Sequence, residues 1–326
     1  MSKSTTKTFL VFGSRGWIGG QIKTLLLADN HRVCETNARI QNREAVMATL
    51  DQHKPDFVIN CAGVTGRPNV DWCEDNKQQT VRTNVIGTLS LIDCCFLKGI
   101  PITNFGTGCI FTYDKDHAMG SGVGFKEGDQ PNFIGSFYSR TKGYADQLYD
   151  IYPNCLNLRI RMPISDDLSP RNFVTKILKY ARIVNIPNSL SILHDLLPIS
   201  IEMTTAVTFD KDGKFASRKY HGNYNFTNPG TMSHNQVVDL YIKIVDPKVS
   251  YTNFSLEDQA KILKADRSNN ELDMSKLKKA FPNLPSAEEA LTNCFKRLKK
   301  NLNVQPGDTK SKWIVQQKLQ TSSTQC

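Results

Sequence analysis

"TFLVFGSRGWIGGQI", residues 8–22, is the stretch that decides the fold. An apolar run opens it and predicts a buried strand, and the amphipathic run that begins at Trp17 predicts a helix. Where strand and helix join, Gly13, Gly16 and Gly19 follow a GxxGxxG spacing. In such a turn the first glycine permits a tight bend, the second lets the backbone approach a pyrophosphate, and the third lets helix and strand pack closely. The stretch therefore predicts a dinucleotide-binding turn.

The same alternation of short apolar runs and longer amphipathic runs continues to about residue 160. We expect strands at 8–13, 31–36, 56–63, 101–106 and 155–160, and helices at 17–29, 43–53, 71–97 and 138–150. This order predicts a parallel sheet with helices on both faces. Right-handed crossovers then make it a doubly wound α/β fold of Rossmann type. We assign residues 1–163 to this dinucleotide-binding domain.

The pattern becomes less regular after residue 163. We expect a smaller, mixed substrate-binding part at 164–300, interleaved with the last strands of the sheet. Its helices are expected near 171–182, 233–245 and 286–299, and a Lys/Asp/Gly-rich insertion near 209–219 is expected to be a loop. Residues 301–326 are rich in Gln, Ser, Thr and Lys and predict a disordered, basic polar tail.

Charge and cysteine usage limit the compartment and the partners. The net charge is +10, but residues 296–326 hold seven Lys/Arg and one Asp, so over half of the excess lies near the end of the chain. We therefore do not expect a nucleic-acid partner. The N-terminus lacks a signal h-region, no window suits a membrane span, and the nine scattered cysteines form no CxxC pair. We expect a cytoplasmic protein without metal, disulfide framework or membrane contact.

The glycine turn leaves the choice of dinucleotide open. Glu35 stands near the end of the second strand, where an acidic residue would hold the ribose of NAD. Arg15 lies within the glycine turn and Arg39 follows the second strand, and basic residues there favour the phosphate of NADP. We therefore predict NADPH as the cofactor, with NADH tolerated; the alternative is that Arg39 is simply solvated. Further cofactor contacts are expected from the start of the first helix and from the "NCAG" that follows the third strand, namely Trp17, Ile18, Cys61, Ala62 and Gly63.

A tyrosine and a lysine in "SFYSRTKGY" carry the predicted chemistry. Tyr138 and Lys142 are four residues apart and therefore share one helix face. A free phenol has a pKa of about 10, and we expect the nearby ammonium to lower it so that the phenol can exchange protons. Thr107 ends a strand and supplies a hydroxyl that could orient a carbonyl oxygen beside Tyr138. With the glycine turn, this set resembles the extended short-chain dehydrogenases/reductases, in which Ser/Thr, Tyr and Lys form the catalytic set.

The resemblance extends to a narrower family over about residues 8 to 300. The strings that carry it are "GWIGG", "AGVTGRPNVDWCE", "TGCIF", "GSGVGFKE", "PNFIGSFYSRTK", "RIRMPI", "PRNF", "NIPNS", "LLPISIEM", "NFTNPG" and "RSNNELD". Together they resemble the nucleotide-rhamnose synthase/epimerase-reductases. The resemblance implies a 3,5-epimerase/4-reductase that converts UDP- or dTDP-4-keto-6-deoxyglucose to the L-rhamnose nucleotide. The 209–219 insertion and the tail after 300 depart from the pattern.

Epimerisation needs an acid and a base besides the Tyr–Lys pair. On an extended backbone, residues two apart point to the same side, so Thr107 and Cys109 are expected to face one pocket. A thiol near a cation can exchange protons near neutrality. We expect Cys109 to be one acid/base group and Lys176, in "PRNFVTK", to be the other. The alternatives are an inert buried thiol and a solvated helical lysine.

The remaining site residues are expected from the resemblance together with their chemistry. Asn84 and Arg161 are expected to line the cofactor site. The polar groups expected to bind the nucleotide diphosphate of the substrate are Arg67, Asn132, Asn172, Asn185 and Arg267.

Two other functions remain open at this point. A reductase that resembles bacterial dTDP-4-dehydrorhamnose reductase would share Thr107, Tyr138 and Lys142 but would not need Cys109. A non-catalytic regulatory subunit would use the fold only to bind a dinucleotide. In plants the epimerase-reductase unit is often fused behind a dehydratase; here no second glycine turn is found, so we expect a separate 4,6-dehydratase. We also expect a homodimer, because two helices of this fold commonly pair.

Overall fold

A six-stranded parallel sheet forms the centre of the molecule in the computed structural model, which describes residues 6–66 and 69–302. The strand order is β12-β5-β4-β3-β1-β2, and every neighbouring pair is parallel. The strands are β1 (Thr8–Phe12), β2 (Arg32–Glu35), β3 (Phe57–Asn60), β4 (Ile102–Thr107), β5 (Cys155–Ile160) and β12 (Gly222–Asn225). The prediction of a doubly wound Rossmann-type fold is confirmed.

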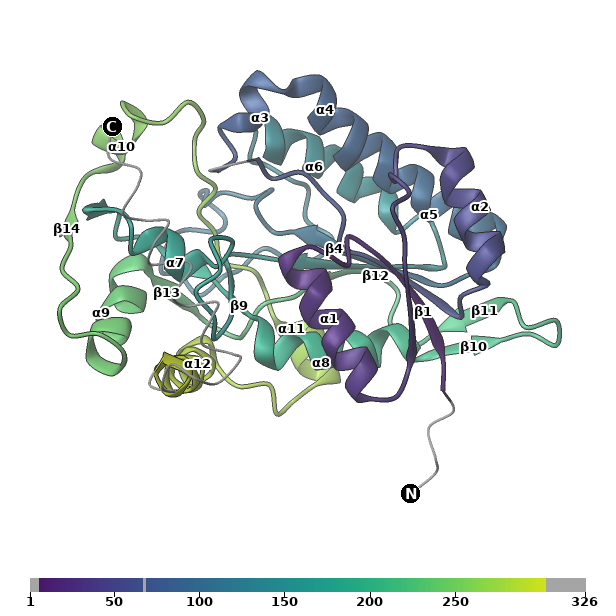
Figure 1. Ribbon diagram of the computed structural model, residues 1–326. Coiled ribbons are helices and arrows are strands. Elements are labelled where there is room, and N and C mark those ends of the chain that lie inside the picture. Colours follow the sequence, from purple (N-terminus) through teal and green to yellow (C-terminus); the bar gives the residue numbers. More distant parts are fainter. Residues whose placement is uncertain (1–5, 67–68, 303–326) are drawn as a thin grey trace.

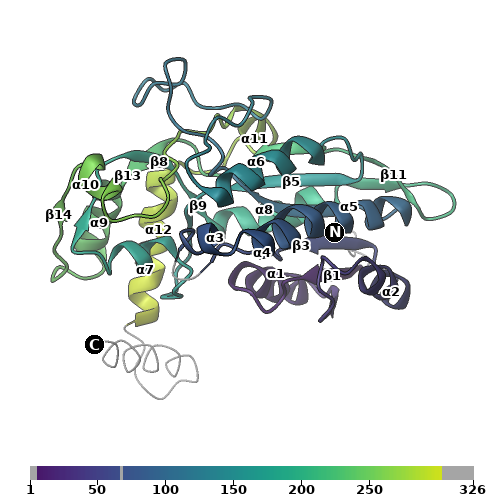
Figure 2. The ribbon, with the colours of Figure 1, turned by 90° about the horizontal axis from the view of Figure 1, so that it is seen from above.

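Helices cover both faces of this sheet (Figures 1 and 2). Leu10 and Val58 point to one face, where they pack with apolar side chains of α2 and α5. Phe9 and Phe57 point to the other face and pack against α1 and α8. The helices are α1 (Trp17–Ala28), α2 (Arg43–His53), α3 (Trp72–Asp75), α4 (Lys77–Val81), the π-helical η1 (Arg82–Gly87), α5 (Thr88–Leu97), α6 (Phe137–Tyr149) and α8 (Leu193–Thr205). The alternation of buried side chains along β1 and β3 therefore builds two apolar layers.

Within the described ranges, one helix is long and apolar enough to cross a membrane, the run Lys77–Leu97. Leu91, Ile92, Cys94 and Cys95 on this run are fully buried and belong to the layer between the sheet and α2. The run therefore packs as a core helix of the α/β unit.

The smaller part lies beyond the carboxyl edge of the sheet and has its own core around Leu291 and Phe295 of α12 and Tyr241 of α9. Its elements are β6 (Pro163–Ile164), α7 (Phe173–Ile177), β7 (Arg182–Ile183), β8 (Pro187–Ser189), β9 (Ser191–Ile192), β13 (Thr231–Ser233), α9 (His234–Ile244), β14 (Thr252–Asn253), α10 (Leu256–Ala260) and α12 (Ala287–Leu302). α11 (Ser275–Ala280) packs instead against β12 of the main sheet. Between β9 and β13 the chain returns to the main sheet to supply α8 and β12. The region after residue 163 is thus shared between both parts of the molecule.

We expected the insertion near 209–219 to be a loop, but it forms most of a β-hairpin. β10 (Val207–Phe209) pairs antiparallel with β11 (Phe215–Arg218), and Gly213 at φ +74° closes the turn. The hydroxyls of Thr208 and Ser217 lie 2.7 Å apart across the two strands. Asp210, Lys211, Asp212 and Lys214 occupy the turn, which projects from the sheet (Figure 1).

Four asparagines form a hydrogen-bonded row that runs from β3 in the middle of the sheet to β12 at its edge. Asn60 donates to Asn104 (2.8 Å), Asn104 to Asn157 (2.8 Å) and Asn157 to Asn223 (2.7 Å), and all of them lie in register on neighbouring strands. One end of the row fixes the turn after β3, because Asn60 Oδ1 accepts from the N–H of Ala62. Near the other end, Asn157 also donates to the carboxylate of Asp146 on α6. This row ties the turn after β3 to the helix that carries Tyr138 and Lys142.

The close packing of α1 on β1 leads to a stability prediction. A Cβ on Gly19 would lie 2.2 Å from the carbonyl oxygen of Gly13, whereas a Cβ on Gly20 would meet its nearest neighbour at 3.6 Å. Gly19→Ala is expected to lower the free energy of unfolding by about 1–3 kcal/mol through overpacking. Gly20→Ala, the matched control, is expected to raise it by about 0.5–1 kcal/mol through helix propensity. Urea unfolding of both variants measures the difference, and equal stabilities would contradict this account of the turn.

Candidate active site

The glycine turn at the end of β1 has the geometry of a phosphate cradle. Gly13 adopts φ +76°, and a Cβ there would lie 2.8 Å from the backbone nitrogen of Ala62. Gly16 is the N-cap of α1 and offers no side chain to the free N–H groups of the first turn, at Trp17 and Ile18. Those donors and the positive end of the helix dipole are suited to a pyrophosphate. The turn therefore fits a dinucleotide.

Charged residues beside the turn bear on the choice of dinucleotide. Glu35 at the end of β2 accepts from Ser14 Oγ at 2.8 Å and forms a salt bridge with Lys23. The hydrogen bonds from Lys23 and Ser14 lower the pKa of Glu35, so this carboxylate is ionised and its charge is balanced. Arg15 and Arg39 are exposed, and among the described residues no hydrogen bond or ion pair occupies either.

The loop after β3 forms the opposite wall of the cradle. Asn84 lies on η1, and its side chain holds both backbone groups of Val64, accepting from the nitrogen at 2.8 Å and donating to the oxygen at 2.7 Å. A π-helical turn inside a longer helix often marks a functional site. Asn84 thus holds the loop that begins with Cys61, Ala62 and Gly63. Burial raises the pKa of Cys61 to about 12, so this thiol stays protonated.

Thr107 ends β4, and its side chain forms a hydrogen bond with Tyr138 at the start of α6, the helix that also carries Lys142. Ser136 caps α6, and the two site residues of that helix follow one turn apart, both buried. Burial, the largest effect, raises the pKa of Tyr138, and a hydrogen bond with Thr107 acts in the opposite direction. We expected Lys142 to lower this pKa; instead the phenol is held protonated because it is buried. A protonated phenol suits a group that must donate a proton to a developing alkoxide.

Cys109 lies on the wall of a cavity of about 330 Å³ that also takes in Tyr138 and Lys176. The expected extended path from Thr107 to Cys109 is wrong, because β4 ends at Thr107 and the chain turns at Gly108. The turn connects the two residues differently: the Cys109 N–H donates to Thr107 Oγ1 at 3.1 Å. The thiol therefore enters the cavity from a turn.

Lys176 approaches the same cavity from α7 in the smaller part of the molecule. Burial and the neighbouring Arg171 lower its pKa, while Cys109 acts in the opposite direction. A lysine with a lowered pKa can act as a base closer to neutral pH. Cys109 and Lys176 thus present two groups capable of proton exchange to one space.

Arg161 lies against Cys109. We expected it to line the cofactor site, which stays a prediction; its buried guanidinium donates to Cys109 Sγ at 3.4 Å and to Ser268 Oγ at 3.0 Å. The residue follows β5 at the carboxyl edge of the sheet, which brings it beneath the thiol. Its guanidinium therefore contacts Cys109 from behind the cavity wall and does not itself line the cavity.

Of the described residues expected to bind the nucleotide diphosphate, one lies on the cavity wall and three do not. Arg267 lines the cavity and pairs with Asp71 at 2.7 Å. The side chain of Asn132 is bound to the backbone of Thr112 and to Asp114, and the exposed Asn185 is not on the cavity wall. Asn172 is buried; it caps α7 and donates to the carbonyls of Ser165 and Asp167. Arg67 lies outside the described residues.

Sequence reasoning missed several groups on the cavity wall. His234 at the start of α9 is partly buried, and burial lowers its pKa. Ser268 and Asn269 stand in the string "RSNNELD", which we used only for Arg267, so its run of polar residues was an available signal. The apolar end of the cavity comes from short elements without a periodic pattern, and its residues are Phe173, Ile177, Tyr180, Ile183, Val184, Phe254, Ile262 and Leu263.

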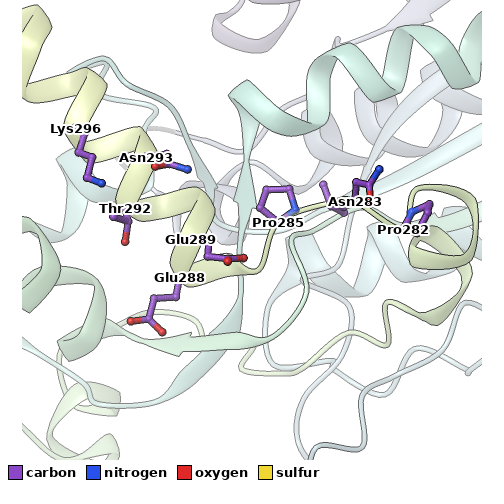
Figure 3. A pocket seen from close by; sticks show the side chains of 9 residues that line it. Pro282, Asn283, Pro285, Glu288, Glu289, Thr292, Asn293 and Lys296 are labelled. Atoms are coloured by element: carbon purple, nitrogen blue, oxygen red, sulfur yellow. The ribbon is translucent and has the colours of Figure 1, made fainter.

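A second hollow, of about 630 Å³, lies between α12 and the loop before it (Figure 3). Glu288, Thr292 and Lys296 project from the helix there, and Pro282 and Pro285 lie on the loop. Glu289 accepts from the backbone and the hydroxyl of Ser286, as acids near a helix N-terminus do. Helix capping accounts for Glu289, and the hollow shares no residue with the Tyr138 cavity.

The helix that carries Tyr138 and Lys142 begins at the carboxyl edge of a doubly wound sheet, the edge at which the glycine turn also lies, and this arrangement defines an extended short-chain dehydrogenase/reductase. Residues 7–300 match the family model of the RmlD substrate binding domain. The chain belongs to this family. Matched members of it are reductases and epimerases of nucleotide-rhamnose biosynthesis, and the chain is an enzyme of that kind.

Two relatives from Arabidopsis thaliana are similar over most of this chain. A bifunctional dTDP-4-dehydrorhamnose 3,5-epimerase/dTDP-4-dehydrorhamnose reductase is 51% identical over 291 residues, which cover 89% of this chain and 93% of the relative. A trifunctional UDP-glucose 4,6-dehydratase/UDP-4-keto-6-deoxy-D-glucose 3,5-epimerase/UDP-4-keto-L-rhamnose-reductase is 50% identical over 87% of this chain and 41% of its own length. This chain therefore spans less than half of the trifunctional relative.

Among solved structures, the UDP-rhamnose synthase L780 of Acanthamoeba polyphaga mimivirus is similar with a TM-score of 0.81 at 37% identity, over 90% of this chain and 99% of that one. A dTDP-4-dehydrorhamnose reductase from Bacillus anthracis, in complex with NADP, has a TM-score of 0.73 at 18% identity, over 90% of this chain and 98% of that one. The second likeness shows the fold.

Proposed function

We propose that the chain is a bifunctional 3,5-epimerase/4-reductase that converts UDP- or dTDP-4-keto-6-deoxyglucose to the L-rhamnose nucleotide. The observation that carries the proposal is the single cavity onto which Tyr138, Cys109 and Lys176 all open. The names of the 51% identical bifunctional relative and of the mimivirus synthase support it.

One polarised oxygen can serve both reactions. The two inverted carbons, C3 and C5, flank the C4 ketone, so each proton can leave as an enolate forms at that oxygen. Tyr138 and the Thr107 hydroxyl hold this oxygen and stabilise the enolate and, later, the alkoxide. In the reduction, Tyr138 donates its proton to the C4 oxygen.

Cys109 and Lys176 carry out the inversion. Because they reach the sugar from the turn after β4 and from α7, one can remove a proton while the other returns a proton to the opposite face. Arg267 supplies a cation on the same wall for the anionic nucleotide.

The cofactor is NADPH, with NADH tolerated, and when bound it supplies the hydride for C4. Gly13, Gly16 and the first turn of α1 hold its pyrophosphate. Arg15 and Arg39 lie where a ribose phosphate would need cations. Glu35 forms its salt bridge with Lys23, so both arginines are available to bind that phosphate.

Removal of one of these cations tests the cofactor assignment. Arg39→Ala is expected to raise KM for NADPH by about tenfold, the loss of one exposed charge-assisted contact, and to leave KM for NADH within about twofold. Arg32→Ala, at the exposed first residue of β2, is the control for net charge. Equal effects on both cofactors would contradict the assignment.

The pH profile of reduction reports on Lys142. Burial lowers its pKa to about 8, while Asp146 acts in the opposite direction. Below that pH the lysine is charged and can assist Tyr138; above it the charge is lost, so kcat/KM for reduction is expected to fall as the pH rises through about 8. Lys142→Arg keeps the charge and should move this alkaline limb upward. A flat wild-type profile to about pH 9.5 would rule out this role for Lys142.

The same proposal implies partners and a compartment. A 4,6-dehydratase supplies the 4-keto sugar, and the trifunctional relative names such an activity. We expect a homodimer, since the exposed Ile86, Tyr144 and Leu148 form an apolar outer surface on the neighbouring η1 and α6, and light scattering tests this. The eight described cysteines are free, which supports the expected cytoplasmic location.

Direct assay tests the proposal. The pure protein is incubated with NADPH and UDP- or dTDP-4-keto-6-deoxyglucose, while NADPH absorbance and, by NMR, sugar stereochemistry are followed. NADPH oxidation with formation of the L-rhamnose nucleotide is expected. If only an already epimerised 4-keto sugar is reduced, the chain is a reductase alone; if NADPH binds without ever being oxidised, the regulatory-subunit alternative holds.

A further inference from the structure

Arg161 is the closest cationic neighbour of the Cys109 sulfur for which a contact is found. Its Nη1 donates to Cys109 Sγ at 3.4 Å and to Ser268 Oγ at 3.0 Å, while Nη2 donates to the carbonyl of Ser268 and to Asn188 Oδ1. The guanidinium is held by groups from three separate segments of the chain, and the side chain is almost completely buried. Its position relative to the sulfur is therefore fixed.

No carboxylate in residues 6–66 and 69–302 forms an ion pair with Arg161. The other acceptors around it are neutral amide, hydroxyl and carbonyl oxygens, and its Nε has no partner there. Arg159, two residues earlier and equally buried, is paired with the carboxylate of Asp146. A buried cation is costly unless an anion compensates it. Two groups that could become an anion interact with Arg161, the Cys109 thiol and the Tyr113 phenol. Burial raises the pKa of Tyr113 to about 12, which leaves the Cys109 thiol.

Other charged groups face this sulfur from the elements around it. Lys176 of α7 and Tyr138 of α6 both interact with it electrostatically. Farther along the cavity wall are Asp266 and Arg267, and the latter is paired with Asp71. Of these, Tyr138 stays protonated, Lys176 has a lowered pKa, and Arg267 has its own carboxylate, so Arg161 supplies the fixed unpaired charge at the sulfur.

We propose that Arg161 is a positioning residue for epimerisation: its fixed charge lies against the Cys109 sulfur and favours the thiolate, the form that can remove a proton from the sugar. This inference rests on the proposed function of Cys109 and adds a direction to it. The sulfur begins as the base, taking a proton from C3 or C5, and Lys176 in its protonated form gives a proton to the opposite face. Each inversion then leaves a thiol and a neutral amine, which exchange a proton through solvent before the next one.

Alkylation of Cys109 by iodoacetamide tests this without any sugar substrate. The rate at Cys109 is followed by peptide mass spectrometry on the full chain, with buried Cys155 as an internal monitor of unfolding. Because a nearby opposite charge favours the thiolate, Arg161→Gln is expected to slow alkylation about tenfold or more at about pH 6.5 and to leave it unchanged at about pH 10. Arg267→Gln, which removes a paired cation from the same cavity, should alter neither rate by more than about twofold. Wild-type alkylation rates in Arg161→Gln at both pH values would overturn the proposal.

Two further measurements complete the test. Alkylation of Cys155 in Arg161→Gln would show that this variant has lost its fold. In that case the ultraviolet absorbance of the thiolate is compared between the wild type and Cys109→Ala at about pH 6.5. Excess absorbance in the wild type supports the proposal, and its absence overturns it. Arg161→Lys, which keeps a charge, should recover most of the alkylation rate. If the wild type does not epimerise the sugar but Arg161→Gln still slows alkylation of Cys109, the proposed epimerase function is wrong and the role of Arg161 at the sulfur stands. The two claims can therefore fail separately.

Discussion

Replacement of Tyr138 by Phe is expected to lower the rate of 4-keto reduction by about 10²–10⁴-fold, the usual contribution of a positioned acid. The phenol is buried, its pKa is raised, and it shares its site with the Thr107 hydroxyl, so no solvent group can readily replace it. Epimerisation should fall as well, because the same oxygen carries the enolate charge. Both rates are measured, reduction with an already epimerised 4-keto sugar and epimerisation by proton exchange.

The matched control for this variant lies on the same helix. Tyr144 is 61% exposed on the outer face of α6, so Tyr144→Phe should leave both rates within about twofold of wild type. If Tyr138→Phe lost reduction but epimerised at the wild-type rate, the enolate would need another stabilising group. The shared-oxygen mechanism would then be wrong.

Replacement of Cys109 by Ala is expected to separate the two activities. Epimerisation should fall by about 10²-fold or more, because one of the two acid/base groups is gone. Reduction of an already epimerised 4-keto sugar should persist, since it uses Tyr138, Thr107 and Lys142. Rates of NADPH oxidation with the epimerised and the non-epimerised substrate measure the separation.

Cys109→Ser preserves most of the side-chain volume and should also lose epimerisation, because a hydroxyl does not ionise near neutral pH as a thiol does. Lys176→Ala should likewise lose epimerisation while reduction of the epimerised sugar persists, because it removes the acid/base group on α7. Conversion of the 4-keto-glucose nucleotide by Cys109→Ala at the wild-type rate would remove the thiol from the mechanism.

The parts of the fold that follow periodic patterns could be predicted from the sequence. β5 and α2 begin and end at the expected residues, and the glycine turn joins β1 to α1 as expected. α8 was missed, because Pro198 lies inside it and proline usually argues against a helix interior. In the 209–219 insertion the Asp and Lys residues concealed a hairpin whose strands have only three and four residues.

The site could be predicted where local spacing determines proximity. Tyr138 and Lys142 share a helix face, and the carboxyl ends of parallel strands bring Thr107 and the glycine turn to one edge. The contact between Arg161 and Cys109 depends on a turn at Gly108 and on a loop more than a hundred residues farther along the chain, at Ser268. No local sequence pattern predicts a contact between residues so far apart in the chain. Burial also determined the direction of the Tyr138 pKa, which sequence spacing alone did not reveal.

Solvent deuterium incorporation tests most directly whether one cavity performs both reactions. The wild-type protein converts UDP-4-keto-6-deoxyglucose with NADPH in deuterium oxide, and the product is examined by NMR. The account predicts an L-rhamnose nucleotide with deuterium at C3 and at C5 and with hydrogen from NADPH at C4. A reduced sugar that has kept its original protons at C3 and C5 would contradict it.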